Sequence, residues 1–180
     1  GRDDSDEWWQ LDPVAGTLYA TPEDIAFTCV LPLETEDIKP PYSVVIFGHG
    51  YGSSRIEMLA FGYAVNRMGL AVCSMDFPGH GLGLKAEDEA IIEALLPPLG
   101  LLPFYDHIQD SRQRDLNNDG FPDSGGDQWS ADGFHTRDMV RQAVVDWMQM
   151  VRSFKACGET SMEETEHIEP SFEGTGAYRM

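Results

Sequence analysis

Two apolar runs, each followed at once by a Gly-rich turn, most constrain what this chain can fold into. Residues 43–47 (SVVIF) and 70–75 (LAVCSM) are continuous β-branched and apolar runs, as expected of strands buried on both faces of a parallel sheet. Between them, residues 55–68 place apolar side chains at helical spacing, with Ser53 or Ser54 as the cap and Gly69 as the stop. This order predicts a βαβ crossover, and hence an α/β fold with a mostly parallel sheet and flanking helices.

The rest of the chain extends this organisation within one domain of 180 residues. The pattern predicts a strand at 25–31, a helix at 85–96, a Pro-, Gly- and Asp-rich insertion at 97–131 and a long amphipathic helix at 136–154. The last 25 or so residues are acidic and predict no further persuasive strand.

Charge and cysteine content limit the partners. Thirty-one acidic residues against twelve basic ones give a formal charge of −19, which disfavours nucleic acid and anionic membranes and suits divalent cations. No apolar run is long enough for a transmembrane helix. Cys29, Cys73 and Cys157 show no metal-site spacing. We interpret Cys29 and Cys73 first as buried free thiols, and a disulfide between them stays open if their strands are neighbours.

The first Gly-rich turn, Gly48-His49-Gly50-Tyr51-Gly52, can carry chemistry. Glycines directly after a buried strand let the backbone turn sharply and present N–H groups to a ligand. In acyl transfer such groups stabilise the oxyanion of the tetrahedral intermediate. An ordinary strand-to-helix turn is the alternative, while a nucleotide fingerprint is disfavoured because no third glycine follows in register.

The second turn, residues 76–81 (DFPGHG), makes the pair more specific. The run from Tyr42 to Gly83 resembles the third strand, oxyanion loop, first helix and fourth strand of α/β-hydrolases, whose fourth strand often ends in a D-x-x-G-H-G turn. The resemblance implies that the backbone N–H of Tyr51 donates to the oxyanion. It also implies that His49 and Gly50 shape the oxyanion loop, and that His49 is not the triad histidine.

Residues 115–123 (DLNNDGFPD) predict a calcium loop. Oxygen side chains at alternate positions, followed by Gly120, let a loop wrap around a hard cation. The expected ligands are Asp115, Asn117, Asp119, the backbone carbonyl of Phe121, and Asp123. Gly126 stands where an EF-hand has its bidentate Glu, so a structural Ca²⁺ turn is expected rather than an EF-hand sensor, and an Asx-rich turn without metal is the alternative.

This loop followed by Thr136-Arg137-Asp138 and a long helix is similar to bacterial extracellular lipases. The resemblance implies an extracellular or cell-surface location and an acyl-ester or lipid substrate. We interpret Arg137 and Asp138 as a structural ion pair. Residues 94–104, rich in Pro and Leu, predict either a lid over an acyl pocket or a core-facing loop.

The nucleophile is missing. α/β-Hydrolases carry a G-x-S-x-G elbow, and none occurs here. Ser161 and Ser171 lack the flanking glycines, and His167 is interpreted as a surface histidine. We therefore expect a carboxylic-ester hydrolase of the lipase or esterase type whose serine lies outside this chain, so that the chain alone is inactive. A calcium-stabilised extracellular binding or adhesion module, and a peptidase on the same fold, are the alternatives.

Overall fold

The computed structural model describes residues 9–19, 23–160 and 177–179, which divide into two compact units. Residues 25–129 form one unit, and the described parts of 1–24 and 130–180 belong to the other.

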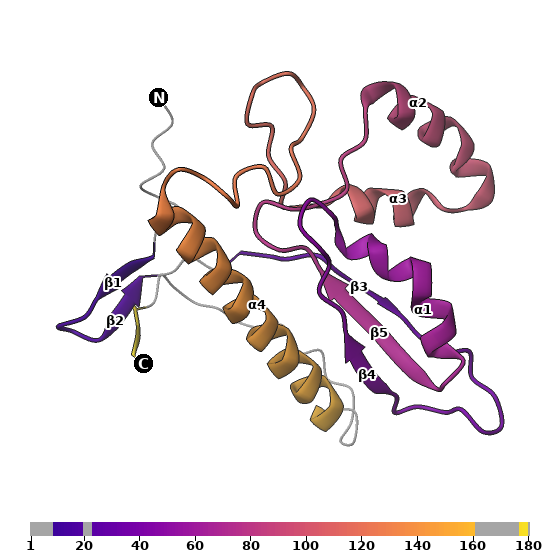
Figure 1. Ribbon diagram of the computed structural model, residues 1–180. Helices are drawn as coiled ribbons and strands as arrows, with labels where there is room; N and C mark the ends of the chain where they lie inside the picture. The colour runs from indigo at the N-terminus through magenta and orange to yellow at the C-terminus, as the bar shows by residue number, and fades with distance from the viewer. Residues whose placement is uncertain (1–8, 20–22, 161–176, 180) are drawn as a thin grey trace. The chain divides into compact units, whose positions relative to one another are not determined.

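The 25–129 unit is built on a three-stranded mixed sheet with flanking helices, which confirms the α/β class (Figure 1). Its strands β3 (Phe27–Val30), β4 (Ser43–Ile46) and β5 (Leu70–Met75) lie in the order β3-β5-β4. The β4–β5 pair is parallel, as the βαβ pattern predicts, whereas β3 pairs antiparallel to β5. The expected mostly parallel sheet is therefore mixed, because β3 adds its strand in the opposite direction.

The crossover between β4 and β5 consists of a 3₁₀ turn, η2 (Arg55–Met58), and helix α1 (Leu59–Asn66). Gly62 faces the sheet, and a Cβ there would make ordinary van der Waals contact with Val30 at 3.8 Å, so this approach does not require a glycine. Asn66 closes the end of the helix by donating its side-chain amide to the carbonyl oxygens of Val30 and Leu70. The prediction of one helix over residues 55–68 was right in place but too long.

Strands β4 and β5 differ in burial although their sequences look alike. All of β5 after Leu70 is buried, with Val72 at 0% exposure. On β4, by contrast, Val44 is 44% and Ile46 36% exposed. The prediction that residues 43–47 are buried on both faces is thus wrong for the described chain. The reason is that β5 is the central strand, whereas β4 has a described neighbour on only one edge.

The segment after β5 is more helical than predicted. It contains α2 (Ala86–Leu95), the 3₁₀ turn η3 (Pro97–Leu99) and α3 (Leu102–Gln109), and then an irregular loop to residue 129. Helix α2 was predicted, whereas α3 was not, because Pro103 sits at its start, where a proline is tolerated.

In the other unit, β1 (Gln10–Asp12), β2 (Thr17–Tyr19) and β6 (Ala177–Arg179) form an antiparallel sheet in the order β1-β2-β6. Helix α4 (Gly133–Thr160) is the predicted long helix, extended at both ends. Strand β6 falls in the tail for which the sequence predicted none, and at three residues it is too short to leave a pattern.

Candidate functional site

The turn that follows β4 holds the predicted oxyanion loop. Ser53 N donates to Gly50 O at 3.1 Å, and Gly52 has a φ of +71°, which defines a type II turn with Tyr51 at its second position. The Glu57 carboxylate supports the turn by accepting from Ser53 Oγ at 2.8 Å and from Gly50 N at 3.3 Å. These two hydrogen bonds, the one from Ser53 most, lower the pKa of Glu57. Within the described chain no acceptor pairs with the Tyr51 N–H.

A second turn of the same kind follows β5. His80 N donates to Phe77 O at 3.0 Å, Pro78 stands at the second position and Gly79 at the third has a φ of +72°. Because β4 and β5 are parallel neighbours, their carboxyl ends bring the two turns to the same edge of the sheet. The structure therefore places together the two motifs that the sequence analysis singled out.

His49 joins the two turns. Its Nδ1 lies 2.9 Å from Gly50 O, and its Nε2 accepts from Phe77 N at 3.0 Å. A carbonyl only accepts, so Nδ1 carries the proton and the ring is the neutral tautomer. Burial lowers the pKa of His49, a residue that is 4% exposed. With both ring nitrogens engaged, His49 positions the turns and is not a free base.

A buried ion pair, which the sequence analysis missed, lies beneath the turns. Asp76 at the end of β5 accepts from Arg55 N at 2.6 Å and from the Arg55 guanidinium. The same guanidinium donates to Thr28 Oγ1 at 3.1 Å and to His107 O at 2.5 Å, so it connects β3, β5 and α3. Arg55 and Asp76 are each 1% exposed. The sequence signal was weak: Asp76 directly follows the apolar run 70–75, whereas Arg55 comes three residues after Gly52.

The predicted calcium loop is wrapped by its own side chains. Asp115 accepts from the backbone N–H groups of Asp119 at 3.2 Å and Gly120 at 2.8 Å. Asn117 Oδ1 accepts from Asp119 N at 2.8 Å, and Asp123 Oδ2 accepts from Leu116 N at 3.1 Å. Gly120, with a φ of +85°, makes the bend that the pattern requires. These side chain to backbone hydrogen bonds are those of an Asx-rich turn, with which both the calcium loop and the metal-free alternative are consistent.

The chemistry of these residues suits a hard cation, because every atom expected to bind the metal is an oxygen. In the described chain, however, no three His, Cys, Asp or Glu side chains converge as a metal-binding group. The carboxylates instead accept backbone N–H groups of the loop. The Asp115–Asp123 loop thus contains oxygen atoms of the kind that bind calcium, and a calcium site there remains a proposal.

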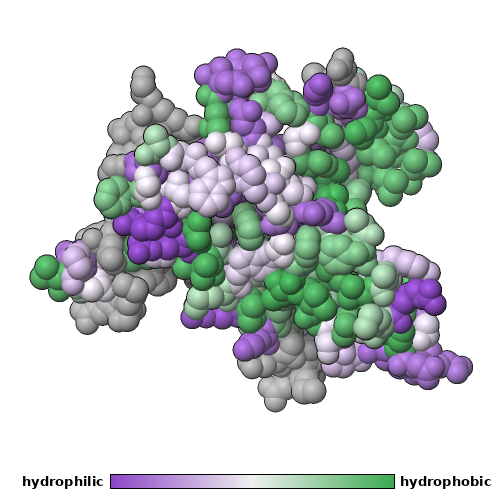
Figure 2. Space-filling view, viewed as in Figure 1, coloured by the Kyte–Doolittle hydropathy of each residue, from purple (hydrophilic) through white to green (hydrophobic). Residues whose placement is uncertain are grey.

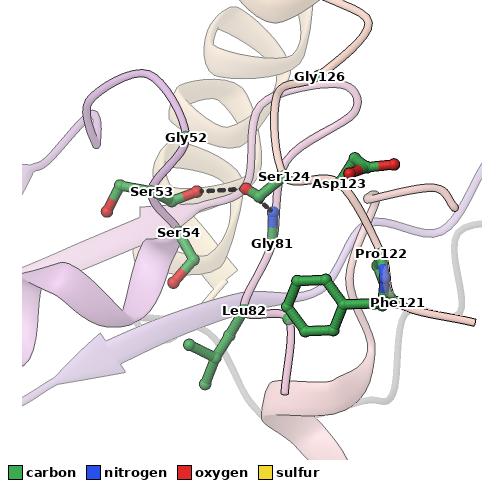
Figure 3. A pocket seen from close by; sticks show the side chains of 11 residues that line it. Gly52, Ser53, Ser54, Gly81, Leu82, Phe121, Pro122, Asp123, Ser124 and Gly126 are labelled. Atoms are coloured by element: carbon green, nitrogen blue, oxygen red, sulfur yellow. Dashed lines mark hydrogen bonds between the residues drawn. The ribbon is translucent and has the colours of Figure 1, made fainter. Parts of the chain in front are cut away.

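The end of this loop crosses both turns; we call residues 121–126 the strap. Ser124 Oγ donates to Ser53 O at 3.1 Å and accepts from Gly81 N at 3.2 Å (Figure 3). Gly125 N donates to Gly79 O at 2.8 Å, and a Cβ on Gly125 would lie 2.5 Å from His80 Nε2. The strap is therefore fixed to both turns, and its closest approach requires glycine.

Between the strap and the turns lies a cleft of about 490 Å³. It is lined by Gly52, Ser53, Ser54, Gly81, Leu82, Gly83, Phe121, Pro122, Asp123, Ser124 and Gly126. Ser54 stands at the start of η2, as predicted, but its side chain makes no capping hydrogen bond. The Gly-rich turn after β4 and the Asp-rich loop, 63 or more residues apart in sequence, thus share one cleft.

The segment from α2 to α3 is an apolar surface. Its exposed side chains are Ile91, Leu95, Leu99, Leu101, Leu102 and Phe104. Figure 2 shows the hydrophobic colouring gathered over α2 and α3. This exposure contradicts the core-facing alternative for residues 94–104.

In the second unit, Arg137 and Asp138 form the expected ion pair. Arg137 Nε donates to Asp138 Oδ1 at 2.7 Å, and Trp9 N and Arg141 also donate to this carboxylate. These contacts, the one from Arg137 first, lower the pKa of Asp138. Ser161, Ser171 and His167 lie outside the described residues.

The cysteines correct one prediction. Cys29 and Cys73 are directly opposed on β3 and β5 and form a disulfide, so the free-thiol interpretation was wrong for this pair and the alternative is confirmed. Cys157 is free and exposed.

Within the described ranges, no helix has the length and apolarity needed to cross a membrane. Comparison with family models, with curated proteins and with solved structures finds no match. The function is therefore argued from the site itself.

Proposed function

We propose that this chain is part of a serine-type carboxylic-ester hydrolase of the α/β-hydrolase kind, in which the turn after β4 supplies an oxyanion donor. The observation that carries the proposal is the type II turn at Gly50–Ser53 with Tyr51 at its second position. Its neighbours are tied down by hydrogen bonds, while the Tyr51 N–H has no acceptor in the described chain. A fixed and unpaired N–H is what electrostatic stabilisation of an oxyanion requires.

The sheet supports the same proposal. Ligands of α/β proteins bind beyond the carboxyl ends of parallel strands, which is where both turns lie. Strand β4 has an exposed edge among the described residues, and its side chains are open on both faces. A further parallel strand that ends in a nucleophile elbow can pair with β4 and bring its serine to the same edge.

The proposed roles follow from the geometry. The serine attacks the acyl carbon, and the Tyr51 N–H stabilises the resulting oxyanion by about 3–4 kcal/mol. His49 is not the base, because Phe77 N and Gly50 O occupy its two nitrogens. The apolar surface from α2 to α3 is proposed as a lid over the acyl chain, with an extracellular location favoured by the Cys29–Cys73 disulfide.

The test uses Tyr51→Pro in a protein that extends this chain through the proposed elbow. Proline suits the second position of a type II turn, and it removes the N–H together with the phenol ring. We expect kcat for p-nitrophenyl butyrate to fall about 100- to 1000-fold. Tyr51→Ala also removes the ring but keeps the N–H, and it should stay within about twofold of the parent, since Tyr51 is 63% exposed.

Two results would contradict the proposal. One is a downstream sequence with no strand and elbow serine. The other is a folded Tyr51→Pro protein with unchanged kcat, because the N–H would then have no role in the reaction.

We also propose that Ca²⁺ braces the Asp115–Asp123 loop. The folded loop and its all-oxygen donor set support this. Calcium at about 100 times its Kd should stabilise the chain by about 2.7 kcal/mol, seen as a higher Tm than in chelator. Asp119→Ala should abolish the shift, and Asp37→Ala, an exposed residue outside the loop, should keep it. An unchanged Tm in the parent would remove the calcium proposal.

A further inference from the structure

His80 lies beneath the strap and is 0% exposed. Its Nδ1 lies 2.9 Å from Pro78 O. Because a carbonyl oxygen only accepts, Nδ1 carries the proton, and Nε2 is left with a lone pair. Within the part of the chain that the structure describes, no donor reaches Nε2. A buried polar atom without a partner is uncommon in folded proteins, so this nitrogen needs an explanation.

Gly125 of the strap covers this nitrogen. A Cβ on Gly125 would lie 2.5 Å from His80 Nε2 and 3.0 Å from His80 Cδ2, so the Gly125 backbone stands against the edge of the ring. Gly125 N donates to Gly79 O at 2.8 Å. Ser124 Oγ donates to Ser53 O at 3.1 Å (Figure 3). The strap is therefore held by hydrogen bonds in which the His80 ring takes no part, and it fits over a ring whose Nε2 carries no proton.

The charged and titratable residues around His80 offer no acceptor for a proton on Nε2. They come from its own turn, the turn after β4, the segment after α3 and the chain on either side of Gly125: Asp76, His49, Tyr51, Arg112, Asp123 and Asp127. The three carboxylates accept from the Arg55 N–H and the Leu116 N–H or lie 3.8 Å from Arg114 Nη1. In the described chain none of them is within hydrogen-bond distance of Nε2. The His49 ring, at a centroid distance of 5.1 Å, adds no negative charge.

A proton on Nε2 therefore sets two effects against each other. While the strap is closed, the imidazolium is buried without an acceptor, which is strongly disfavoured. The strap itself is held by a few neutral hydrogen bonds, each of modest net strength because water can replace it. When the strap moves away, water can solvate the charged ring at the cost of those bonds alone, so the charge outweighs them.

We propose that His80 makes closure of the strap depend on pH. With Nε2 unprotonated, the strap lies over the two Gly-rich turns. When Nε2 takes up a proton from solvent, the strap moves away at Gly125 and the cleft beneath it opens. Access to the edge of the sheet at which both turns lie thus rises as the pH falls. Opening requires neither a nucleophile nor a substrate, so it does not depend on the proposed function.

The test is hydrogen exchange of backbone amides in the 180-residue chain, followed by ¹⁵N NMR at about pH 7.5 and about pH 5.5, the range in which histidines change charge. The protection factor, which is the intrinsic exchange rate divided by the measured one, removes the pH dependence of exchange itself. We expect the Gly125 amide to lose at least about tenfold in protection at the lower pH. Val72 in the buried strand β5 should stay at least about tenfold better protected than Gly125 at both pH values, because the strap opens without global unfolding.

His80→Asn is the decisive variant. Its side-chain amide can donate to Pro78 O in place of Nδ1 but cannot take up a proton, so the protection of Gly125 should agree within about twofold at the two pH values. His49→Gln is the matched control, since it removes the neighbouring imidazole and should keep the tenfold fall. Circular dichroism checks the fold of both, and His80→Gln replaces His80→Asn if that variant is unfolded. All samples contain EDTA, so that calcium at the Asp115–Asp123 loop makes no contribution.

The proposal is overturned if the protection of Gly125 does not fall in the parent, or if it falls as much in the folded His80 variant. It is also overturned if Gly125 exchanges no faster than Val72 at the lower pH, because the whole unit would then be unfolding. Loss of the fall in folded His49→Gln would have the same consequence, since the proton would then act at His49.

Discussion

The Arg55–Asp76 pair should dominate the stability of the 25–129 unit. Both residues are 1% exposed, and the guanidinium donates to Asp76, Thr28 Oγ1 and His107 O. Arg55→Met removes these hydrogen bonds and leaves the Asp76 carboxylate buried, with the backbone N–H of residue 55 still donating to it. An uncompensated buried charge of this kind costs about 3–5 kcal/mol.

The magnitude can be separated from simple loss of packing. Asp76→Asn leaves the guanidinium buried without its counter-ion. It should likewise lower the free energy of unfolding by about 3–5 kcal/mol. The double variant Arg55→Met/Asp76→Asn buries no uncompensated charge. Its cost should therefore fall at least about 2 kcal/mol below the sum of the single costs, because the two residues are in direct contact.

Urea unfolding followed by circular dichroism gives these free energies. Arg67→Met, an exposed arginine at the end of α1, is the control and should lie within about 0.5 kcal/mol of the parent. Costs below about 1 kcal/mol for Arg55→Met, or additive costs in the double variant, would refute the reasoning, since they would mean that the buried charges are not coupled.

Three further predictions concern the unit's other constraints. Burial lowers the pKa of His49, so the folded state disfavours its protonation. Above about pH 6.5 the imidazole is neutral in both the folded and the unfolded chain, and the free energy of unfolding does not depend on it. Below that pH the unfolded chain takes up the proton first, so the free energy of unfolding should fall by up to about 1.4 kcal/mol per pH unit until the folded-state pKa is reached. His49→Gln should flatten that part of the curve of unfolding free energy against pH, and an unchanged slope would contradict the assignment. Reduction of the Cys29–Cys73 disulfide, which spans 44 residues, should cost about 4 kcal/mol in the same urea assay, whereas no shift would mean that the bond is not formed in solution. Gly125→Ala should cost about 1–3 kcal/mol more stability than Gly100→Ala. Both glycines have a left-handed φ, but only a Cβ on Gly125 meets a side chain, that of His80 at 2.5 Å. Equal decreases in Tm for the two variants would show that the strap can move away from His80 at little cost.

The sequence predicted the strands and turns of the site, but not that β5 is buried while β4 is exposed. Residues 43–47 and 70–75 are equally apolar, and a run of this kind indicates a strand without saying how many neighbours it has. The pairing of Cys29 with Cys73 likewise depends on register, which their spacing of 44 residues does not encode. The parallel order of β4 and β5 was predictable, and it alone brought the two Gly-rich turns together.

Contacts between residues that are far apart in the sequence could not be predicted. Ser124 is one of several small polar residues in the 97–131 insertion, and nothing local marks it as the residue that bonds to Ser53 and Gly81. Arg55 could be expected to begin a helix on the surface, because an arginine is rarely buried without a partner. Its partner Asp76 lies 21 residues away, and only the fold brings them together.

Under the proposed function, the hydrogen bonds around Tyr51 would let its N–H act as an oxyanion donor without reorganisation. On one side Gly50 O accepts from Ser53 N and lies 2.9 Å from His49 Nδ1, and Gly50 N donates to Glu57. On the other side Ser124 donates to Ser53 O. The turn that carries Tyr51 is thus held at Gly50 O, at Gly50 N and at Ser53 O, while the Tyr51 N–H is left unpaired in the described chain. A donor that is already fixed when charge develops loses no free energy to reorientation, which is the source of its catalytic value. Under the proposed function, loosening any one of these three supports should therefore reduce turnover more than it reduces stability.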